Sequence, residues 1–393
     1  MARFDFFNTP RILFGRGRIA EIGTLSKSFG ARVLLVYNGD APGAGGPLDR
    51  ATDQLRSALV EVHAFRQRGE PQVSDVERAV AAAGEAGCDV VVGLGGGSAI
   101  DCAKAVAGVL ANGGSPLDYM EVIGQGRPLT KQATPWIAVP TTAGTGAEVS
   151  RNAVVGEPTR KFKASLRSEL LLPRVALVDP ELGVNVPPDV TAASGMDALC
   201  QLVESYTSTG AQPMTDALAL RGIELAARAL PRAFRNGADL DAREDMALAA
   251  LLSGITLTNA GLGAVHGFAA PLGANFPVPH GVVCAALLPH VMRANIDALW
   301  NQSKDHPLLE RYAAVGRLLL GWPDAERHAA AEAGIDAAEA LARALKIPGL
   351  GNYGLADSDV PAMVALAKRA SSMRFNPVAL SDDALADVLR SAL

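Results

Sequence analysis

Asp89-Val-Val-Val-Gly-Leu-Gly-Gly-Gly-Ser98 is the stretch of sequence that decides the fold. An apolar run leads into three glycines and a serine, and a helical pattern follows. Short apolar strands that turn into helices are typical of a parallel sheet covered on both faces. Glycines let a backbone approach a pyrophosphate closely, and a helix start offers N–H groups and partial positive charge. We therefore predict that Gly95, Gly96, Gly97 and Ser98 bind the phosphates of a dinucleotide. The turn lacks the GxGxxG fingerprint, and by itself it also suits a plain strand-to-helix turn.

The pattern around this stretch divides the chain into an α/β part and a helical part. Apolar segments predict strands at 33–37, 60–65, 89–93, 136–140 and 175–179, with helices at 47–59, 73–86 and from Ser98 onward. We expect Ser74 to be an N-cap. After Pro187-Pro188 almost every segment has helical periodicity, namely 191–206, 213–234, 242–260, 307–319, 325–345, 360–370 and 382–393, the last with Ser381 as N-cap. We predict an N-terminal dinucleotide-binding α/β domain at 1–185 and an all-α domain that binds metal and substrate at 186–393.

A second loop of small residues supports the dinucleotide hypothesis. Pro140-Thr-Thr-Ala-Gly-Thr-Gly146 follows a predicted strand, and Thr141, Thr142 and Thr145 supply hydroxyl donors. Loops at the ends of neighbouring parallel strands converge on one crevice. Asn38, at the end of another strand, is suited to binding a ribose and does not repel a 2′-phosphate, so NAD and NADP both remain open.

Four polar residues in the second half resemble a metal site. Asp197 and Gln201 are four residues apart and share a helix face. His266 and His280 lie in one apolar segment punctuated by glycine and proline, the first near a helix end and the second in a proline-bounded turn. A carboxylate and two imidazoles are ligands that Zn²⁺ or Fe²⁺ accepts. Single histidines are more often structural, but two of the six in this chain fall in this segment.

Composition narrows the class of protein. The 393 residues carry a net charge of −5, which argues against a nucleic-acid partner. Charges interrupt the apolar runs, and the N-terminus does not have the architecture of a signal peptide. The four cysteines lie among apolar residues without a CxxC pair, as expected of reduced core cysteines. We therefore expect a cytoplasmic protein without a membrane partner.

The motifs together resemble the iron-dependent (group III) alcohol dehydrogenase family along the whole chain. The resemblance is carried by Gly95-Gly-Gly-Ser-Ala-Ile-Asp-Cys-Ala-Lys104, Pro140-Thr-Thr-Ala-Gly-Thr-Gly-Ala-Glu148, Asp179-Pro180, Gly195-Met-Asp-Ala-Leu199, Val278-Pro-His-Gly281 and Leu288-Pro-His-Val291. The family implies that NAD(P) and a divalent metal meet in a cleft between an α/β and a helical domain. It also implies a homodimer formed through an N-terminal strand, for which residues 4–13 are available.

Site residues follow from the family by position. The metal ligands fall on Asp197, Gln201, His266 and His280, and the diphosphate on Gly96, Gly97 and Ser98. Further positions around the cofactor fall on Asp101, Thr141, Thr142, Thr145 and Lys163. Two positions depart from the family pattern. Gln201 replaces the usual second histidine of the helix, which puts tight metal binding in doubt. Ala270 stands where many relatives have a proton-relay histidine, so no general acid–base residue can be assigned.

We expect reversible hydride transfer between a small alcohol and the nicotinamide, with the metal as a Lewis acid on the substrate oxygen. Arg374 is a candidate contact for an anionic substrate, or a solvated loop residue. Three alternatives remain: a maleylacetate reductase that needs no tightly bound metal, a lyase of the dehydroquinate synthase type, and a non-catalytic dinucleotide-binding protein.

Overall fold

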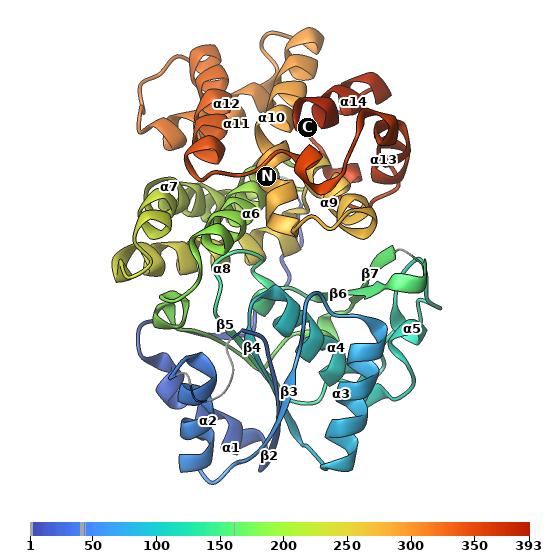
Figure 1. Cartoon of the computed structure of the whole chain (residues 1–393). Helices are drawn as coiled ribbons and strands as arrows, with labels where there is room; N and C mark the ends of the chain where they lie inside the picture. Colours follow the sequence, from blue (N-terminus) through green and yellow to red (C-terminus); the bar gives the residue numbers. More distant parts are fainter. Residues whose placement is uncertain (1–2, 40–42, 44, 161) are drawn as a thin grey trace. The chain divides into compact units, whose positions relative to one another are not determined.

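The computed structural model describes residues 3–39, 43, 45–160 and 162–393. The chain separates into two compact units (Figure 1). One unit spans residues 8–186. The other contains residues 187–393 together with the described residues before position 8.

A parallel sheet forms the centre of the first unit. Six strands of the described chain follow the order β1-β8-β5-β4-β2-β3, and every neighbouring pair is parallel. Their bounds are β1 Arg11–Phe14, β2 Arg32–Tyr37, β3 Glu61–Arg66, β4 Val90–Gly95, β5 Trp136–Pro140 and β8 Val175–Val178. The connecting helices include α1 Ile22–Phe29, α2 Pro47–Ser57, α3 Val73–Glu85 and α4 Gly97–Asn112. The predicted doubly covered parallel sheet is confirmed.

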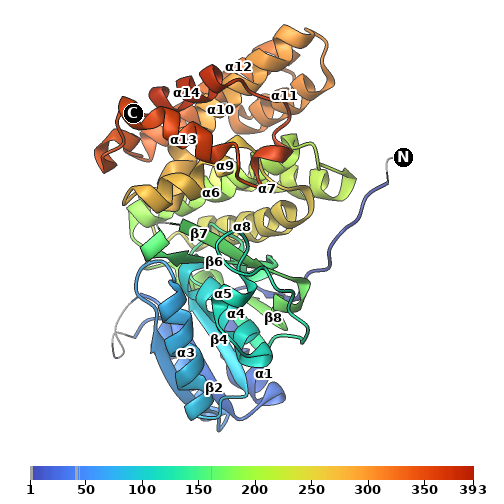
Figure 2. The same ribbon diagram turned by 90° about the vertical axis from the view of Figure 1, so that its right-hand side faces the viewer.

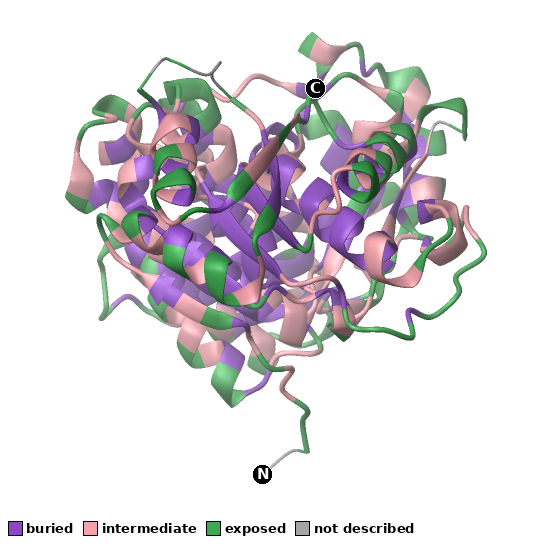
Figure 3. Cartoon of the chain, turned by 90° about the horizontal axis from the view of Figure 1, so that it is seen from below, coloured by how far each residue is buried: buried purple, intermediate pink, exposed green. Residues whose placement is uncertain are grey.

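Alternation along β2 explains why helices cover both faces of the sheet. Val33 and Leu35 pack into one apolar cluster with residues of α1 and α2. Leu34 and Val36 pack into a second cluster with residues of α3 and α4. Successive side chains of a strand point to opposite faces, so a wholly apolar strand needs cover on both. Figure 3 shows the central strands coloured as buried.

Some features of this unit were not predicted. An antiparallel hairpin of β6 Asn152–Glu157 and β7 Phe162–Arg167 follows the loop after β5. Helix α5 spans Pro116–Tyr119. The predicted N-cap Ser74 is wrong, because α3 is capped by Gln72, whose backbone N–H donates to the Asp75 carboxylate at 3.0 Å. That bond starts the helix before Ser74 can cap it.

Helices make up the second unit, and its described residues contain no strand. They are α6 Pro188–Thr207, α7 Pro213–Arg235, α8 Leu240–Ala260, α9 Ala264–Asn275, α10 His280–Gln302, α11 Pro307–Leu320, α12 Arg327–Ala344, α13 Val360–Ala367 and α14 Asp382–Ser391. Ser381 caps α14 as predicted, because its Oγ accepts from the backbone N–H of Ala384 at 3.1 Å. The predicted all-α character of this part is confirmed.

Helices α9 and α10 correct the expectation of a proline-bounded turn around His280. Each contains an internal proline, Pro271 in α9 and Pro289 in α10, and Pro279 is the N-cap of α10. His280 is therefore the first residue of a long helix. α10 is long and apolar enough to resemble a membrane span, but 67% of its apolar window is buried inside the structure. It packs against α6, α9 and α12, as expected of a core helix (Figure 2).

Candidate metal centre and dinucleotide-binding loops

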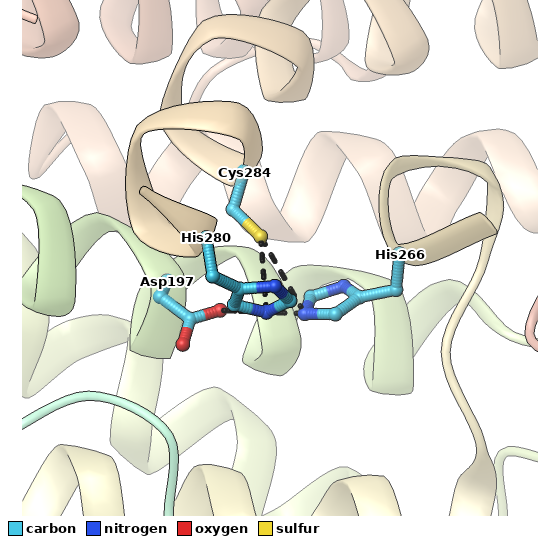
Figure 4. Close-up of side chains that lie close together, drawn as sticks. All are labelled: Asp197, His266, His280 and Cys284. Carbon is cyan, nitrogen blue, oxygen red and sulfur yellow. Dashed lines mark hydrogen bonds and ion pairs between the residues drawn. The ribbon is translucent and has the colours of Figure 1, made fainter. Parts of the chain in front are cut away.

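Four potential metal ligands from three helices of the second unit converge at one point. They are Asp197 of α6, His266 in the first turn of α9, His280 at the start of α10 and Cys284 one turn later (Figure 4). One ligand atom from each lies within 4.8 Å of all the others. Oδ1 of Asp197 is 3.3 Å from Nε2 of His266 and 3.7 Å from Nε2 of His280. The sequence prediction that Asp197 lies beside both histidines is confirmed.

Electrostatics mark this cluster as a place for positive charge. Burial alone would raise the pKa of Asp197, but the nearby His280 and His266 lower it. Burial would lower the pKa values of both histidines. Interactions with Cys284 and Asp197 outweigh that effect, raising the pKa of His280 to about 9 and that of His266 well above its ordinary value. The carboxylate therefore holds protons on the imidazoles, and a divalent cation would replace them.

Glu204 fixes the orientation of His266. The Nδ1 atom of His266 is 2.7 Å from Oε2 of Glu204, and Oε1 of Glu204 accepts from the backbone N–H of Val265 at 2.7 Å. With its Nδ1–H directed to a carboxylate, the imidazole has Nε2, the atom that faces Asp197, left to bind a cation once its proton is displaced. A second carboxylate behind a histidine ligand is a common device that sets the tautomer and raises ligand basicity.

The side of the cluster formed by His280 is open. The side chains of Asp197 and His266 are 2% and 7% exposed, whereas that of His280 is 41% exposed. His280 is therefore the more solvent-exposed of the two histidines. Ala270, at the family's proton-relay position, is exposed and brings no titratable group.

Gln201 is buried and lies one turn after Asp197 on α6. Its Oε1 accepts a hydrogen bond from Oγ of Ser253 in α8 at 2.8 Å. The same hydroxyl also lies 2.8 Å from the Ala250 carbonyl, so its one proton has two acceptors. The role of Gln201 as a metal ligand stays a prediction. Sequence reasoning missed Cys284 and Glu204. Cys284 could have been found from its spacing of four residues after His280, had that histidine been placed on a helix.

The glycine turn and the threonine loop of the first unit touch each other, as predicted. Gly95 has φ +149°, and a Cβ there would lie 2.0 Å from Oδ1 of Asn38. The same oxygen accepts from the backbone N–H of Gly96 at 3.0 Å. A Cβ on Gly96 would approach Oγ1 of Thr142 to 3.2 Å, and one on Gly97 would approach Oγ1 of Thr145 to 2.9 Å.

This close fit makes a cradle that leaves little room for side chains, least of all at Gly95. Thr141 joins it through a backbone hydrogen bond of 2.9 Å to the Gly95 carbonyl. Gly97 and Ser98 open α4, where N–H groups have no carbonyl one turn earlier in the helix. Bare backbone, hydroxyls and a helix start suit a diphosphate.

Asp101 and Lys163 occupy neighbouring parts of the same unit. Oδ2 of Asp101 accepts from the backbone N–H of Val154 on β6 at 3.1 Å, while its buried Oδ1 has no hydrogen-bond partner. That oxygen lies 3.7 Å from Nζ of Lys104, and burial raises the pKa of the carboxyl. An unbonded buried oxygen is free to accept a hydrogen bond from a ligand. Lys163, on β7, forms an ion pair with Glu70 rather than with another predicted cofactor residue.

Both parts of the chain match models of one protein family. Residues 9–180 match the model of iron-containing alcohol dehydrogenase, and residues 191–393 match the C-terminal model of the Fe-containing alcohol dehydrogenase family. The NAD-dependent methanol dehydrogenase of Bacillus methanolicus is 34% identical over 392 residues, which is 99% of this chain and 100% of that protein. The 1,3-propanediol dehydrogenase of Klebsiella pneumoniae is 35% identical over 393 residues, covering 99% and 98%.

Solved structures agree with the sequence relatives. A crystal structure of 1,3-propanediol oxidoreductase superposes with a TM-score of 0.92 at 34% identity and covers 100% of both chains. The match extends over both units and includes the metal-site helices and the glycine turn. The chain belongs to the iron-containing alcohol dehydrogenase family.

Proposed function

We propose that the protein is an NAD-dependent alcohol dehydrogenase that transfers hydride between a small alcohol and the nicotinamide ring. Its membership of the family and its relatives that oxidise methanol and 1,3-propanediol support this function. When bound, a divalent metal, Fe²⁺ or Zn²⁺, supplies a Lewis acid for the substrate oxygen, and NAD supplies the hydride acceptor.

The observation that carries the proposal is the convergence of Asp197, His266 and His280. Their donor atoms lie within 4.8 Å of one another, so a single ion can contact all three. Asp197 would neutralise part of the charge of the ion. Glu204 would keep Nε2 of His266 free of its proton. Gln201 is the predicted fourth ligand, by its family position and its place beside Asp197 on α6.

The cofactor residues are proposed from the first unit. The diphosphate would lie on the cradle of Gly95, Gly96, Gly97 and Ser98, with Thr141, Thr142 and Thr145 supplying hydroxyls. Asn38 would orient the turn through its hydrogen bond to Gly96, and Asp101 and Lys163 would contact the cofactor farther along. Use of NADP in addition to NAD is also proposed, because Asn38 places no negative charge near a 2′-phosphate.

A coupled assay tests the function. Purified protein is incubated with NAD⁺ or NADP⁺ and a series of short alcohols, or with the reduced cofactors and aldehydes, and absorbance of the reduced nicotinamide is followed. We expect cofactor reduction with at least one small primary alcohol or diol and reversal with its aldehyde. Turnover without any net change of NAD(P)H would instead indicate a lyase of the dehydroquinate synthase type.

A maleylacetate reductase type of activity is the second candidate. Gln201 favours it, because a neutral carbonyl oxygen, here facing the Ser253 hydroxyl, is a weaker ligand than the family's histidine. Arg374, which stacks on the Phe375 ring with 4.9 Å between its Cζ atom and the ring centroid, would then contact the anionic substrate. NADH-dependent reduction of maleylacetate that survives exhaustive chelation would establish this alternative. Binding of NADH without turnover of any substrate would indicate the non-catalytic alternative.

We also propose a cytoplasmic homodimer. The family resemblance suggests dimerisation through the N-terminal strand, and residues 11–13 of the expected segment lie in the edge strand β1. Residues 4–10 form no strand in the isolated chain, so their backbone is available to pair with that of a partner. Light scattering of the full chain and of a variant lacking residues 1–9 tests the dimer.

A further inference from the structure

We propose that the Cys284 thiolate is a direct ligand of the catalytic metal and fills the coordination position that Gln201 occupies in the family pattern. The inference rests on the proposed function, which requires a metal at this site. It replaces Gln201 by Cys284 as the fourth ligand. The metal would then be held by one carboxylate, two imidazoles and one thiolate.

Distances around Cys284 are those of a metal-binding polyhedron. Its Sγ atom lies 3.7 Å from Nε2 of His266 and 3.7 Å from Nε2 of His280. Zinc bonds to nitrogen at about 2.0–2.1 Å and to sulfur at about 2.3 Å, so a tetrahedral N–S edge is roughly 3.5 Å long. With a zinc–oxygen bond of about 2.0–2.2 Å, an N–O edge is roughly 3.4 Å long. The distances from Oδ1 of Asp197 to Nε2 of His266 and of His280 are 3.3 and 3.7 Å.

The placement of Cys284 follows from α10. His280 and Cys284 are four residues apart in the first turns of this helix, so both side chains lie on one face. Figure 4 shows the sulfur directed at the two imidazoles. Cys284 is fully buried among polar side chains, whereas a buried cysteine ordinarily packs as a small apolar residue.

Gln201 has another partner. Its carbonyl oxygen lies 2.8 Å from the Ser253 hydroxyl, a hydrogen-bonding partner other than a metal. The Cys200 thiol, next to Gln201 on α6, lies in hydrogen-bonding reach of Cys284, and it would become the donor once Cys284 has lost its proton. A thiolate that is bound to a metal tolerates such a donor well, since sulfur ligands are commonly hydrogen-bonded.

Charge balance also favours sulfur. Two anionic ligands, Asp197 and Cys284, neutralise a divalent ion completely, whereas Asp197 and a neutral glutamine leave a net charge of +1. On binding, the thiol proton leaves to solvent and a sulfur–metal bond forms. A soft thiolate shifts selectivity toward Zn²⁺ and away from hard ions such as Mn²⁺.

Cobalt(II) substitution tests the proposal on the full chain. Metal-free protein is titrated with Co²⁺, and the near-ultraviolet thiolate-to-cobalt charge-transfer band is recorded together with the bound cobalt per chain. We expect one equivalent of cobalt and a clear band. Cys284→Ser should abolish the band and raise the zinc dissociation constant by more than about 100-fold, beyond the loss typical of an outer-shell partner.

Matched variants separate the possible ligands. Cys200→Ser and Gln201→Ala should both keep the band. One bound cobalt per chain without a band in the wild-type protein would overturn the proposal, as would loss of the band in Cys200→Ser alone. If Cys284→Ser fails to fold, zinc-edge X-ray absorption of the wild-type protein replaces it, with a sulfur neighbour at about 2.3 Å expected. Failure of the underlying metal site is a distinct outcome, because cobalt would then not bind or would bind equally to Asp197→Ala.

Discussion

Replacing Glu204 by glutamine tests how the protein prepares His266 for a metal. Both carboxylate oxygens are used at 2.7 Å, one by Nδ1 of His266 and the other by the backbone N–H of Val265. A glutamine of the same shape keeps one acceptor oxygen. Its NH₂ group then faces a second donor, or the imidazole moves its proton to Nε2, the atom that must bind the metal.

The expected magnitude follows from this loss. Leaving one buried donor unsatisfied costs about 1–3 kcal/mol, which corresponds to an increase of about 5-fold to 150-fold in a dissociation constant. Losses of about 10-fold to 100-fold in metal affinity are usual when a residue behind a histidine ligand is removed. We expect Glu204→Gln to weaken zinc binding within this range while the protein stays folded.

Competition with a chromophoric chelator measures the zinc dissociation constant of each metal-free variant. Glu224→Gln is a matched control, because Glu224 is 46% exposed and pairs only with Arg221 among the contacts described for its side chain. The control should bind zinc like the wild-type protein. A Glu204→Gln variant whose zinc affinity stays within about twofold of wild type would refute the assigned role of Glu204, since a range starting near fivefold is expected.

Three further predictions concern the cradle, a buried carboxyl and the metal itself. Gly95→Ala should weaken NADH binding by about tenfold or more, because the backbone angle φ of +149° and a contact of 2.0 Å leave no room for a Cβ. NADH fluorescence measures the affinity, and the control Gly84→Ala, whose added Cβ would meet no atom within 4 Å, should bind NADH like the wild-type protein. Burial raises the pKa of Glu148 to about 7, so its favourable contribution to stability is complete below about pH 4.5 and is lost as the pH rises through 7. The free energy of unfolding in urea should therefore rise for Glu148→Gln, relative to the cofactor-free wild-type protein, by up to about 3 kcal/mol between pH 4.5 and 8. A difference between the two proteins that does not change with pH would contradict the raised pKa. Dialysis against a strong chelator should abolish alcohol oxidation, and Zn²⁺ or Fe²⁺ should restore it; persistence of activity would favour the maleylacetate reductase type.

The sequence predicted most of the parallel sheet because its strands are short apolar runs. The predicted strand 136–140 agrees with β5, and the prediction for β2 differs by one residue at its start. Contact between the glycine turn and the threonine loop was also predictable, because loops at the ends of adjacent parallel strands meet. The β6–β7 hairpin was missed, since its burial alternates and it lies outside the main sheet.

The metal site was predicted only in part. Asp197, His266 and His280 were found from residue chemistry and family position. Helices α9 and α10 were not recognised, because Pro271, Pro289 and neighbouring glycines hide their periodicity. Cys284 therefore looked like an isolated apolar cysteine. Glu204 looked like any helical glutamate, and its importance depends on the start of α9 packing against α6, which tertiary structure alone decides.

The most direct test of the central claim is the metal content of the wild-type protein and of Asp197→Ala after identical reconstitution and gel filtration. We predict close to one Zn²⁺ or Fe²⁺ per wild-type chain and almost none in the variant, with alcohol oxidation lost in parallel. A folded Asp197→Ala protein that retains a full equivalent of metal and full activity would show that these residues do not form the catalytic centre.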